Sequence, residues 1–253
     1  TKRSRSLFAH AKFSKKCDPS LTAPFSRLQA RARFSNCRLD NAPPWSSNLF
    51  LPPCEIAPGA GIAIRTHDEG TLAALRSGEL DFGIFPAVNL PSDFESTTLL
   101  ETSYVQIVRA GHPLEALAGR PEALEALKDF RRIQIVVHPD TDPTAGGMPG
   151  PAKIPLSAGE TILWTESWLG AVTLLERSDF VLAVPWRTAA RLGRSMALTA
   201  VAPIPDAPPL RPALVWHTHR SGDPAFVWLR SLFLSHVERG PDVPHFGRIV
   251  PGS

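Results

Sequence analysis

Residues Trp216–Arg230, WHTHRSGDPAFVWLR, carry the clearest structural signals in the chain. The apolar run Pro212–His217, which leads into this stretch, predicts a buried strand. Asp223 is a favourable N-cap residue, and Pro224 suits the first helical position, where its missing N–H costs nothing. The stretch therefore predicts a strand, a polar turn and a capped helix.

Predicted strands and helices alternate from residue 55 onward. The expected strands are 62–64, 80–85, 104–109, 133–137, 161–164, 180–184 and 212–217. The expected helices are 71–77, 121–127, 166–177, 186–192 and one from Pro224 to a stop at Gly240. This alternation predicts an α/β fold with largely parallel sheets.

The first 54 residues differ in composition from the rest. They contain ten Lys or Arg, two Asp or Glu, and all three cysteines, Cys17, Cys37 and Cys54. A basic stretch could bind nucleic acid or anionic lipid. This one shows no helix-turn-helix periodicity, zinc-ligand spacing or aromatic platform. We therefore predict that 1–54 is an atypical leader, damaged or disordered.

Several classes of protein lack support in the sequence. No apolar run approaches the roughly 18 residues of a membrane span, no secretory signal is visible, and the cysteine spacing fits neither a CxxC site nor a disulfide framework. We expect a cytoplasmic protein without a membrane partner. No GxSxG occurs, Gly59–Gly61 lacks a dinucleotide fingerprint, and Asp140–Asp142 is better interpreted as a turn. The prediction is a protein that is not an enzyme and holds no cofactor.

Four segments, in this order, resemble signatures of the effector-binding domain of LysR-type transcriptional regulators. They are LRSGELDFGI at 75–84, VRAGHPL at 108–114, SDFVLAVP at 178–185 and the Trp216–Arg230 stretch. Any one is a weak signal, but four in family order are a strong one. The sequence shows no helix-turn-helix of its own.

The resemblance implies a type 2 periplasmic-binding-protein-like fold, in which two Rossmann-like α/β lobes are joined by two crossing strands. We expect the crossings near 111–130 and 214–217. The expected division is an effector-binding domain at 55–240, with lobe I at 55–130 plus 216–240, lobe II at 131–215, and a tail at 241–253.

The resemblance also implies a function. Such a domain binds a small-molecule effector, here an aromatic or other organic acid, and the full-length regulator is a dimer or tetramer that binds DNA only through the helix-turn-helix. An alternative is a stand-alone solute-binding protein of the same fold. A lyase or transferase on this fold would need an acid–base pair in the cleft, and the sequence offers none.

The junction after the strand 161–164 supplies the first candidate ligand residues. In the implied fold it faces the cleft, where helix N-termini favour anions. Thr165 and Ser167 are the expected hydrogen-bond donors, and Trp164 or Trp168 would stack on an aromatic ring. Plain N-capping by Ser167 and plain core packing by Trp168 remain alternatives. Glu166 counts against an anion there, since it would repel a carboxylate.

Other candidate ligand residues end strands that the resemblance places at the same cleft: Phe85, Pro86 and His138. His138 has an unperturbed pKa near neutrality, although a surface position is an alternative. His217 and His219 share one face of a predicted strand and could form half a metal site. Spacing suggests no third ligand, so we predict no metal.

The resemblance further implies that lobe I opens with an apolar strand and an amphipathic helix that ends near Ala57–Gly59. Residues 31–54 show neither strand alternation nor a helical stripe. Our hypothesis is that 20–54 is a frameshifted or otherwise damaged version of that strand and helix. A search of all reading frames of the coding DNA tests it.

Overall fold

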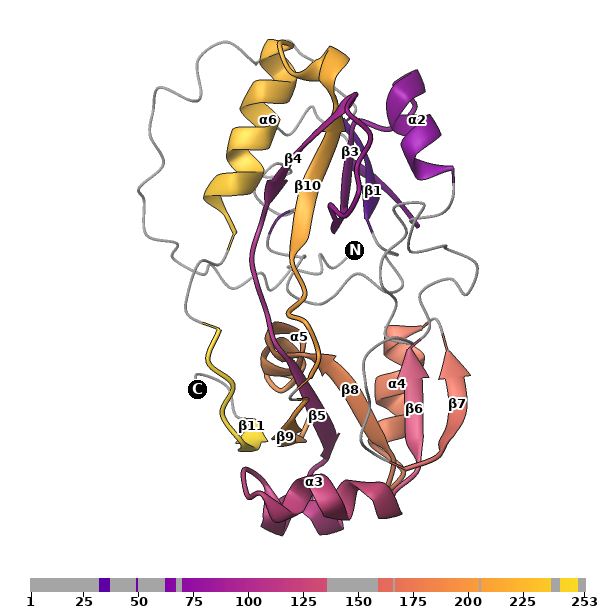
Figure 1. The fold of residues 1–253 in the computed structure, drawn as a ribbon, viewed down its shortest axis with the longest axis vertical. Coiled ribbons are helices and arrows are strands. Elements are labelled where there is room, and N and C mark those ends of the chain that lie inside the picture. The colour runs from indigo at the N-terminus through magenta and orange to yellow at the C-terminus, as the bar shows by residue number, and fades with distance from the viewer. Residues whose placement is uncertain are drawn as a thin grey trace, which may run out of the picture.

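The computed structural model describes residues 62–66, 70–135, 159–165, 167–204, 206–237 and 242–249, together with Leu49 and the backbone of Ala32–Asn36. These residues form two lobes, each built on one sheet, stacked along the long axis of the molecule (Figure 1). The periplasmic-binding-protein-like α/β architecture predicted from the sequence is confirmed.

The sheet of lobe I has five strands in the order β2-β1-β3-β10-β4. Their bounds are β1 Ala32–Asn36, β2 Ile62–Thr66, β3 Phe82–Pro86, β4 Phe94–Thr98 and β10 Pro212–His217. β1, β2 and β3 are parallel, whereas β10 is antiparallel to both β3 and β4. The sheet is therefore parallel on one side only, since the returning strand β10 reverses direction.

The sheet of lobe II has six strands in the order β11-β9-β5-β8-β6-β7. Their bounds are β5 Tyr104–Arg109, β6 Arg132–Ile135, β7 Thr161–Thr165, β8 Val181–Pro185, β9 Leu198–Pro203 and β11 Gly247–Ile249. β6 runs parallel to β7 and β8, and β5 runs antiparallel to β8 and β9.

The chain crosses between the lobes earlier than we expected. β5 already belongs to lobe II, so the first crossing is the short segment 99–103, and the return crossing is 204–211. The predicted crossings near 111–130 and 214–217 were wrong, and with them the lobe bounds 55–130 and 131–215. VRAGHPL misled the prediction because it lies at the end of β5, inside lobe II.

β1 lies within the stretch for which we expected no strand. It pairs with β2 over Ala32–Asn36 and with β3 at three positions, in the interior of the lobe I sheet. Leu49, also from this stretch, is helical and packs in the lobe I core at 2 % exposure. The expectation that residues 31–54 hold no strand was wrong. β1 forms because β2 and β3 pair with its two edges, and its own side-chain pattern does not predict a strand.

Helices cover both sheets (Figure 1). Lobe I carries α2 Thr71–Ser77 and α6 Pro224–Ser235, and lobe II carries α3 Glu122–Ala126, α4 Trp168–Leu175 and α5 Trp186–Leu192, with the 3₁₀ helices η3 Pro113–Leu117, η4 Leu127–Asp129 and η7 Thr218–Arg220. No helix within these described ranges combines the length and apolar character of a membrane span.

The predicted start of α6 is confirmed. The Asp223 carboxylate accepts a hydrogen bond of 2.9 Å from the Ala225 N–H, and Pro224 occupies the first turn. The helix buries Leu229, Leu232 and Phe233, and Leu229 and Phe233 pack in the lobe I core. It ends at Ser235, earlier than the expected stop.

The VRAGHPL segment has a structural role in lobe II. His112 is 2 % exposed, its Nδ1 accepts a hydrogen bond of 3.1 Å from the Leu114 N–H, and its ring lies 4.7 Å from that of Phe130. Burial lowers the pKa of His112, an effect that the nearby Asp179 partly offsets. The fold therefore favours the neutral imidazole.

We predict that His112 makes stability depend on pH. Because its folded pKa lies below the unfolded value of about 6.5, its contribution is complete above that pH and is lost as the pH falls through the folded pKa. Urea unfolding of the native chain should show a free energy that falls between pH 7.5 and 5.5. Asn is also a good cap, so His112→Asn should flatten that slope. An equally steep slope in the variant would contradict this assignment.

Candidate functional site

Strand ends of the two lobes face each other across the crossings. Pro86, at the end of β3, pairs with Pro212, the residue that opens β10 directly after the return crossing. Pro185, at the end of β8, pairs with Tyr104, which opens β5 directly after the first crossing. The carboxyl ends of the parallel strands in both lobes are thus on the crossing side, where α/β sheets bind their ligands.

The junction between β7 and α4 presents two hydroxyls at such a strand end. The Thr165 hydroxyl accepts a hydrogen bond of 3.0 Å from the Ser167 N–H, and the Ser167 hydroxyl accepts one of 3.0 Å from the Gly170 N–H. N-capping by Ser167, one of the two interpretations left open by the sequence, is confirmed. Capping uses a lone pair only, so each hydroxyl retains a proton to donate.

The two tryptophans at this junction differ in environment. Trp168 opens α4 and packs against the lobe II core, so core packing is confirmed for this ring. Trp164 lies on the edge strand β7 and is 64 % exposed. It faces away from Leu163, which packs with the core beneath α4, because side chains alternate along a strand. Trp164 therefore adds little to the stability of lobe II.

The remaining predicted ligand residues lie apart from this junction. Phe85 is 2 % exposed and belongs to the lobe I core with Leu75 and Phe94, and its neighbour Pro86, at the strand end, is buried as well. His138 and Glu166 lie outside the described residues.

Polar residues at the crossings were missed by the sequence analysis. Thr102, fully buried, exchanges two backbone hydrogen bonds with Leu210 across the crossings, 3.0 and 2.8 Å long. Its hydroxyl accepts a hydrogen bond of 3.2 Å from the Arg187 N–H at the start of α5. Asp242 accepts hydrogen bonds from Ser103 at the same place. No pattern in the sequence signals these contacts, which join segments more than 80 residues apart.

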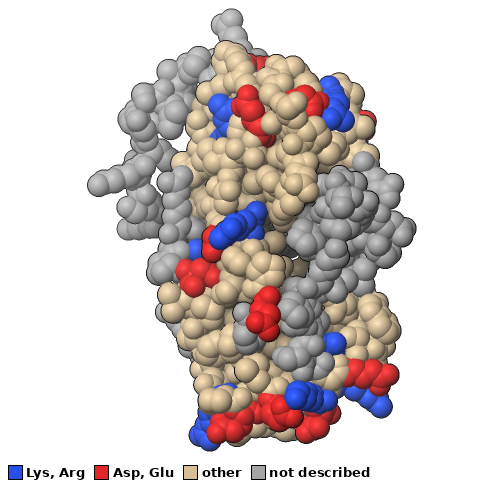
Figure 2. All heavy atoms as spheres, in the orientation of Figure 1, with Lys and Arg blue, Asp and Glu red and all other residues tan. Residues whose placement is uncertain are grey.

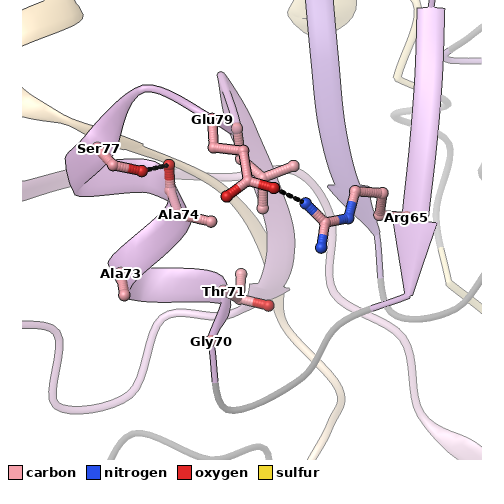
Figure 3. Close-up of a pocket in the computed structure, with 8 residues that line it drawn as sticks. Arg65, Gly70, Thr71, Ala73, Ala74, Ser77 and Glu79 are labelled. Atoms are coloured by element: carbon pink, nitrogen blue, oxygen red, sulfur yellow. Dashed lines mark hydrogen bonds and ion pairs between the residues drawn. The ribbon is translucent and has the colours of Figure 1, made fainter.

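A separate cavity of about 340 Å³ lies beside α2 (Figure 3). Its lining comes from lobe I alone: Arg65, Gly70, Thr71, Ala73, Ala74, Ser77, Glu79 and Leu80. An ion pair between Arg65 and Glu79 spans it. The cavity contains none of the predicted ligand residues.

The two histidines of the WHTH segment have structural contacts. The His217 Nδ1 accepts a hydrogen bond of 3.2 Å from the His219 N–H, and its Nε2 lies 3.3 Å from an Asp93 oxygen. Burial, His217 and Arg220 lower the pKa of His219. Among the residues that the structure describes, no group of three or more His, Cys, Asp or Glu side chains could hold a metal ion.

In each lobe, two of the four signature segments contact each other: 75–84 and 216–230 in lobe I, and 108–114 and 178–185 in lobe II. In lobe I, Arg220 lies 3.8 Å from Asp81, and a Cβ at Gly78 would approach the Arg220 guanidinium to 3.2 Å. In lobe II, Arg109 lies 2.6 Å from Asp179. These signature segments therefore join elements within each lobe.

The charged side chains on the face seen in Figure 2 give little support for nucleic-acid binding there. Figure 2 shows acidic and basic side chains interspersed at the lobe II end, around η3 and α3. Ion pairs there join Arg248 to Glu115 and Lys128 to Glu125. On this face such pairing leaves no continuous basic stripe of the kind that follows a phosphate backbone.

The arrangement of lobes, crossings and strand ends has counterparts in known proteins. The model of the LysR substrate binding domain matches residues 54–238. The chain belongs to the LysR substrate-binding domain family. This family consists of transcription regulators without enzymatic activity, which confirms both the resemblance and the prediction that the chain is not an enzyme.

The curated relatives are longer proteins, and this chain matches a part of each. The sequence is 29 % identical over 161 residues to the HTH-type transcriptional regulator SyrM of Rhizobium meliloti strain 1021, a match that covers 64 % of this chain and 48 % of SyrM. It is 24 % identical over 187 residues to the HTH-type transcriptional activator NahR of Pseudomonas putida, covering 72 % and 57 %. This chain thus spans about half the length of these relatives.

Solved structures share the fold. The regulatory domain of MexT, a transcriptional activator in Pseudomonas aeruginosa, is 21 % identical with a TM-score of 0.65, covering 82 % of this chain and all of that domain. CbnR, a LysR family transcriptional regulator, is 12 % identical with a TM-score of 0.57, covering 83 % and 71 %.

The environments of the two tryptophans predict different costs of truncation. Trp164→Ala should change the free energy of unfolding by less than about 0.5 kcal/mol, as for other exposed positions. Trp168→Ala should cost about 2 kcal/mol or more, because the ring packs in the core. Urea denaturation of both variants measures the difference, and equal losses would contradict these placements.

Proposed function

We propose that this LysR-family effector-binding domain senses an aromatic or other small organic acid held between its lobes. The supporting observation is the pair of hydroxyls at the β7–α4 junction, Thr165 and Ser167, on the side of lobe II where strand ends face lobe I. The site would bind and orient a ligand, since the described residues of the junction offer hydrogen-bond donors.

A carboxylate suits this junction for two reasons. The first N–H groups of an α-helix lack intrahelical acceptors and carry partial positive charge, so the start of α4 at Trp168 favours an anion. The hydroxyl protons of Thr165 and Ser167 can add directed hydrogen bonds to the same oxygen atoms. The carboxylate would thus receive donors from one short segment of lobe II.

The rest of the ligand would contact apolar surface. Trp168, beside the capping serine, is partly buried and would offer part of its ring, whereas Pro86, at the opposite strand end in lobe I, is buried and would have to become exposed to contact the ligand. Phe85 supports Pro86 from the lobe I core. Trp164 and His138, the other predicted contacts, stay candidates for the far end of a longer ligand.

A ligand that contacts both lobes would bias their relative orientation. Only a ligand that binds one arrangement better than another can shift the population. In the full-length regulator we infer that this shift is transmitted to a helix-turn-helix that binds DNA, within a cytoplasmic dimer or tetramer. The exposed apolar side chains Trp164, Leu169 and Leu174, on β7 and α4, offer a face for self-association.

The effector prediction is tested by thermal unfolding of the purified chain with benzoate, phenylacetate and succinate, each with and without EDTA. At a hundredfold excess over its Kd, a bound acid adds about 2.7 kcal/mol. For about 200 residues this raises the Tm by roughly 5–10 °C. The increase should be unaffected by EDTA. No increase with any acid would contradict the proposal.

Ser167→Asp separates capping from ligand binding. Asp caps a helix as well as Ser does, so the Tm without ligand should stay close to that of the native chain. The added negative charge should repel a carboxylate and weaken binding at least tenfold. Thr173→Ala, on the same helix but away from its start, is the matched control and should bind normally. Unchanged binding by Ser167→Asp would place the ligand elsewhere.

A further inference from the structure

The described C-terminal segment, Asp242–Ile249, returns to lobe II after α6 has packed on lobe I. Its strand β11 pairs antiparallel with β9, and Ile249 is 3 % exposed in the lobe II core. Figure 1 shows this yellow segment running from the level of the crossings down to the edge of the lobe II sheet. The segment lies beyond residues 54–238, the part that matches the family.

Asp242 fastens the start of this segment to the first crossing. Its Oδ2 accepts hydrogen bonds from the Ser103 N–H, 2.6 Å, and from the Ser103 hydroxyl, 3.0 Å. Its Oδ1 lies 3.7 Å from the Arg187 Nε, and the exposed fractions of the two side chains are 15 % and 13 %. Hydrogen bonds to an ionised carboxylate are stronger than neutral ones, and partial burial limits their screening.

The residues that Asp242 contacts also hold the crossings together. The Trp186 N–H donates a hydrogen bond of 2.7 Å to the Ser103 carbonyl, and the Arg187 N–H donates to the Thr102 hydroxyl. Thr102 in turn pairs with Leu210 of the return crossing. One carboxylate is therefore linked to both crossings and to the start of α5.

Contacts further along keep the segment on lobe II. The His245 ring lies 4.5 Å from that of Trp186, edge to face, and Phe246 packs against the core. Arg248 lies 3.2 Å from Glu115. The ring contacts fix the position from which Asp242 reaches the crossing, whereas the Arg248–Glu115 pair lies at the surface and adds little.

Chain length makes this attachment a restraint on the lobes. Val237, at 8 % exposure, belongs to the lobe I core, and Asp242 follows it by five residues. Five residues span at most about 18 Å. The lobes are thus tethered a third time, on the side of α6 and β11, in addition to the crossings.

We propose that Asp242–Ile249 is an interlobe strap that restrains rotation of the lobes about the crossings, with Asp242 as the residue that fastens it. If the segment only completed the lobe II sheet, β11 and Ile249 would be sufficient. The hydrogen bonds between the Asp242 carboxylate and Ser103 would then have no role. The strap is a conformational control independent of which effector binds.

Amide hydrogen exchange followed by NMR on the whole chain tests the strap. Asp242→Ala should accelerate exchange at Thr102 and Leu210 about tenfold, because both amides hydrogen-bond across the crossings and neither touches Asp242 directly. Asp242→Asn, which keeps the shape of the side chain and loses its charge, should show a smaller acceleration. This variant replaces Asp242→Ala in the test if the alanine variant folds poorly. Arg248→Gln, at the other end of the segment, should leave both amides unchanged.

Two outcomes would overturn the proposal. One is faster exchange at Ser103 alone, which would mean a local hydrogen bond without control of the crossings. The other is an equal acceleration at Thr102 and Leu210 in Arg248→Gln, which would mean general loosening of lobe II.

Discussion

Two backbone hydrogen bonds between Thr102 and Leu210 hold the crossing segments side by side, and the positions of both sheets depend on them. β5 and β10 begin directly after the two crossings, and each is antiparallel to a strand whose carboxyl end it meets, Pro185 or Pro86. One pairing therefore brings the strand ends of both lobes together. Burial of Thr102 away from water makes the loss of these bonds costly, since the freed groups would lack partners.

The chemistry of the domain follows from this geometry and from how each lobe is stabilised. The conspicuous motifs join elements inside a lobe, through Arg109 and Asp179 in one and Arg220 and Asp81 in the other. These contacts link elements within each lobe and do not cross between the lobes. Less conspicuous residues, such as Thr165 and Ser167, then supply the donors that we propose bind the effector. Under that proposal, a small ligand held at these strand ends would bias the orientation of one lobe relative to the other.

Much of the fold was predictable because its signals are local. Apolar runs, the Asp223–Pro224 helix start and the left-handed Gly78 at the end of α2 act over a few residues. β1 was missed because its place is set by two neighbouring strands, and the crossings were misplaced because only long-range pairing defines them. For the site, the sequence offered capping by Ser167 as one of two interpretations. The contact of Asp242 with Ser103 joins residues 139 positions apart, so no local pattern could predict it.

Measuring the distance between the lobes tests the central claim, that an organic acid changes their orientation about the crossings. Spin labels at Val227→Cys on α6 and Glu125→Cys on α3, with the native cysteines replaced by serine, report that distance by pulsed electron resonance. We expect a saturating acid that raises the Tm also to displace the main distance peak. An identical distribution with and without that bound acid would contradict it.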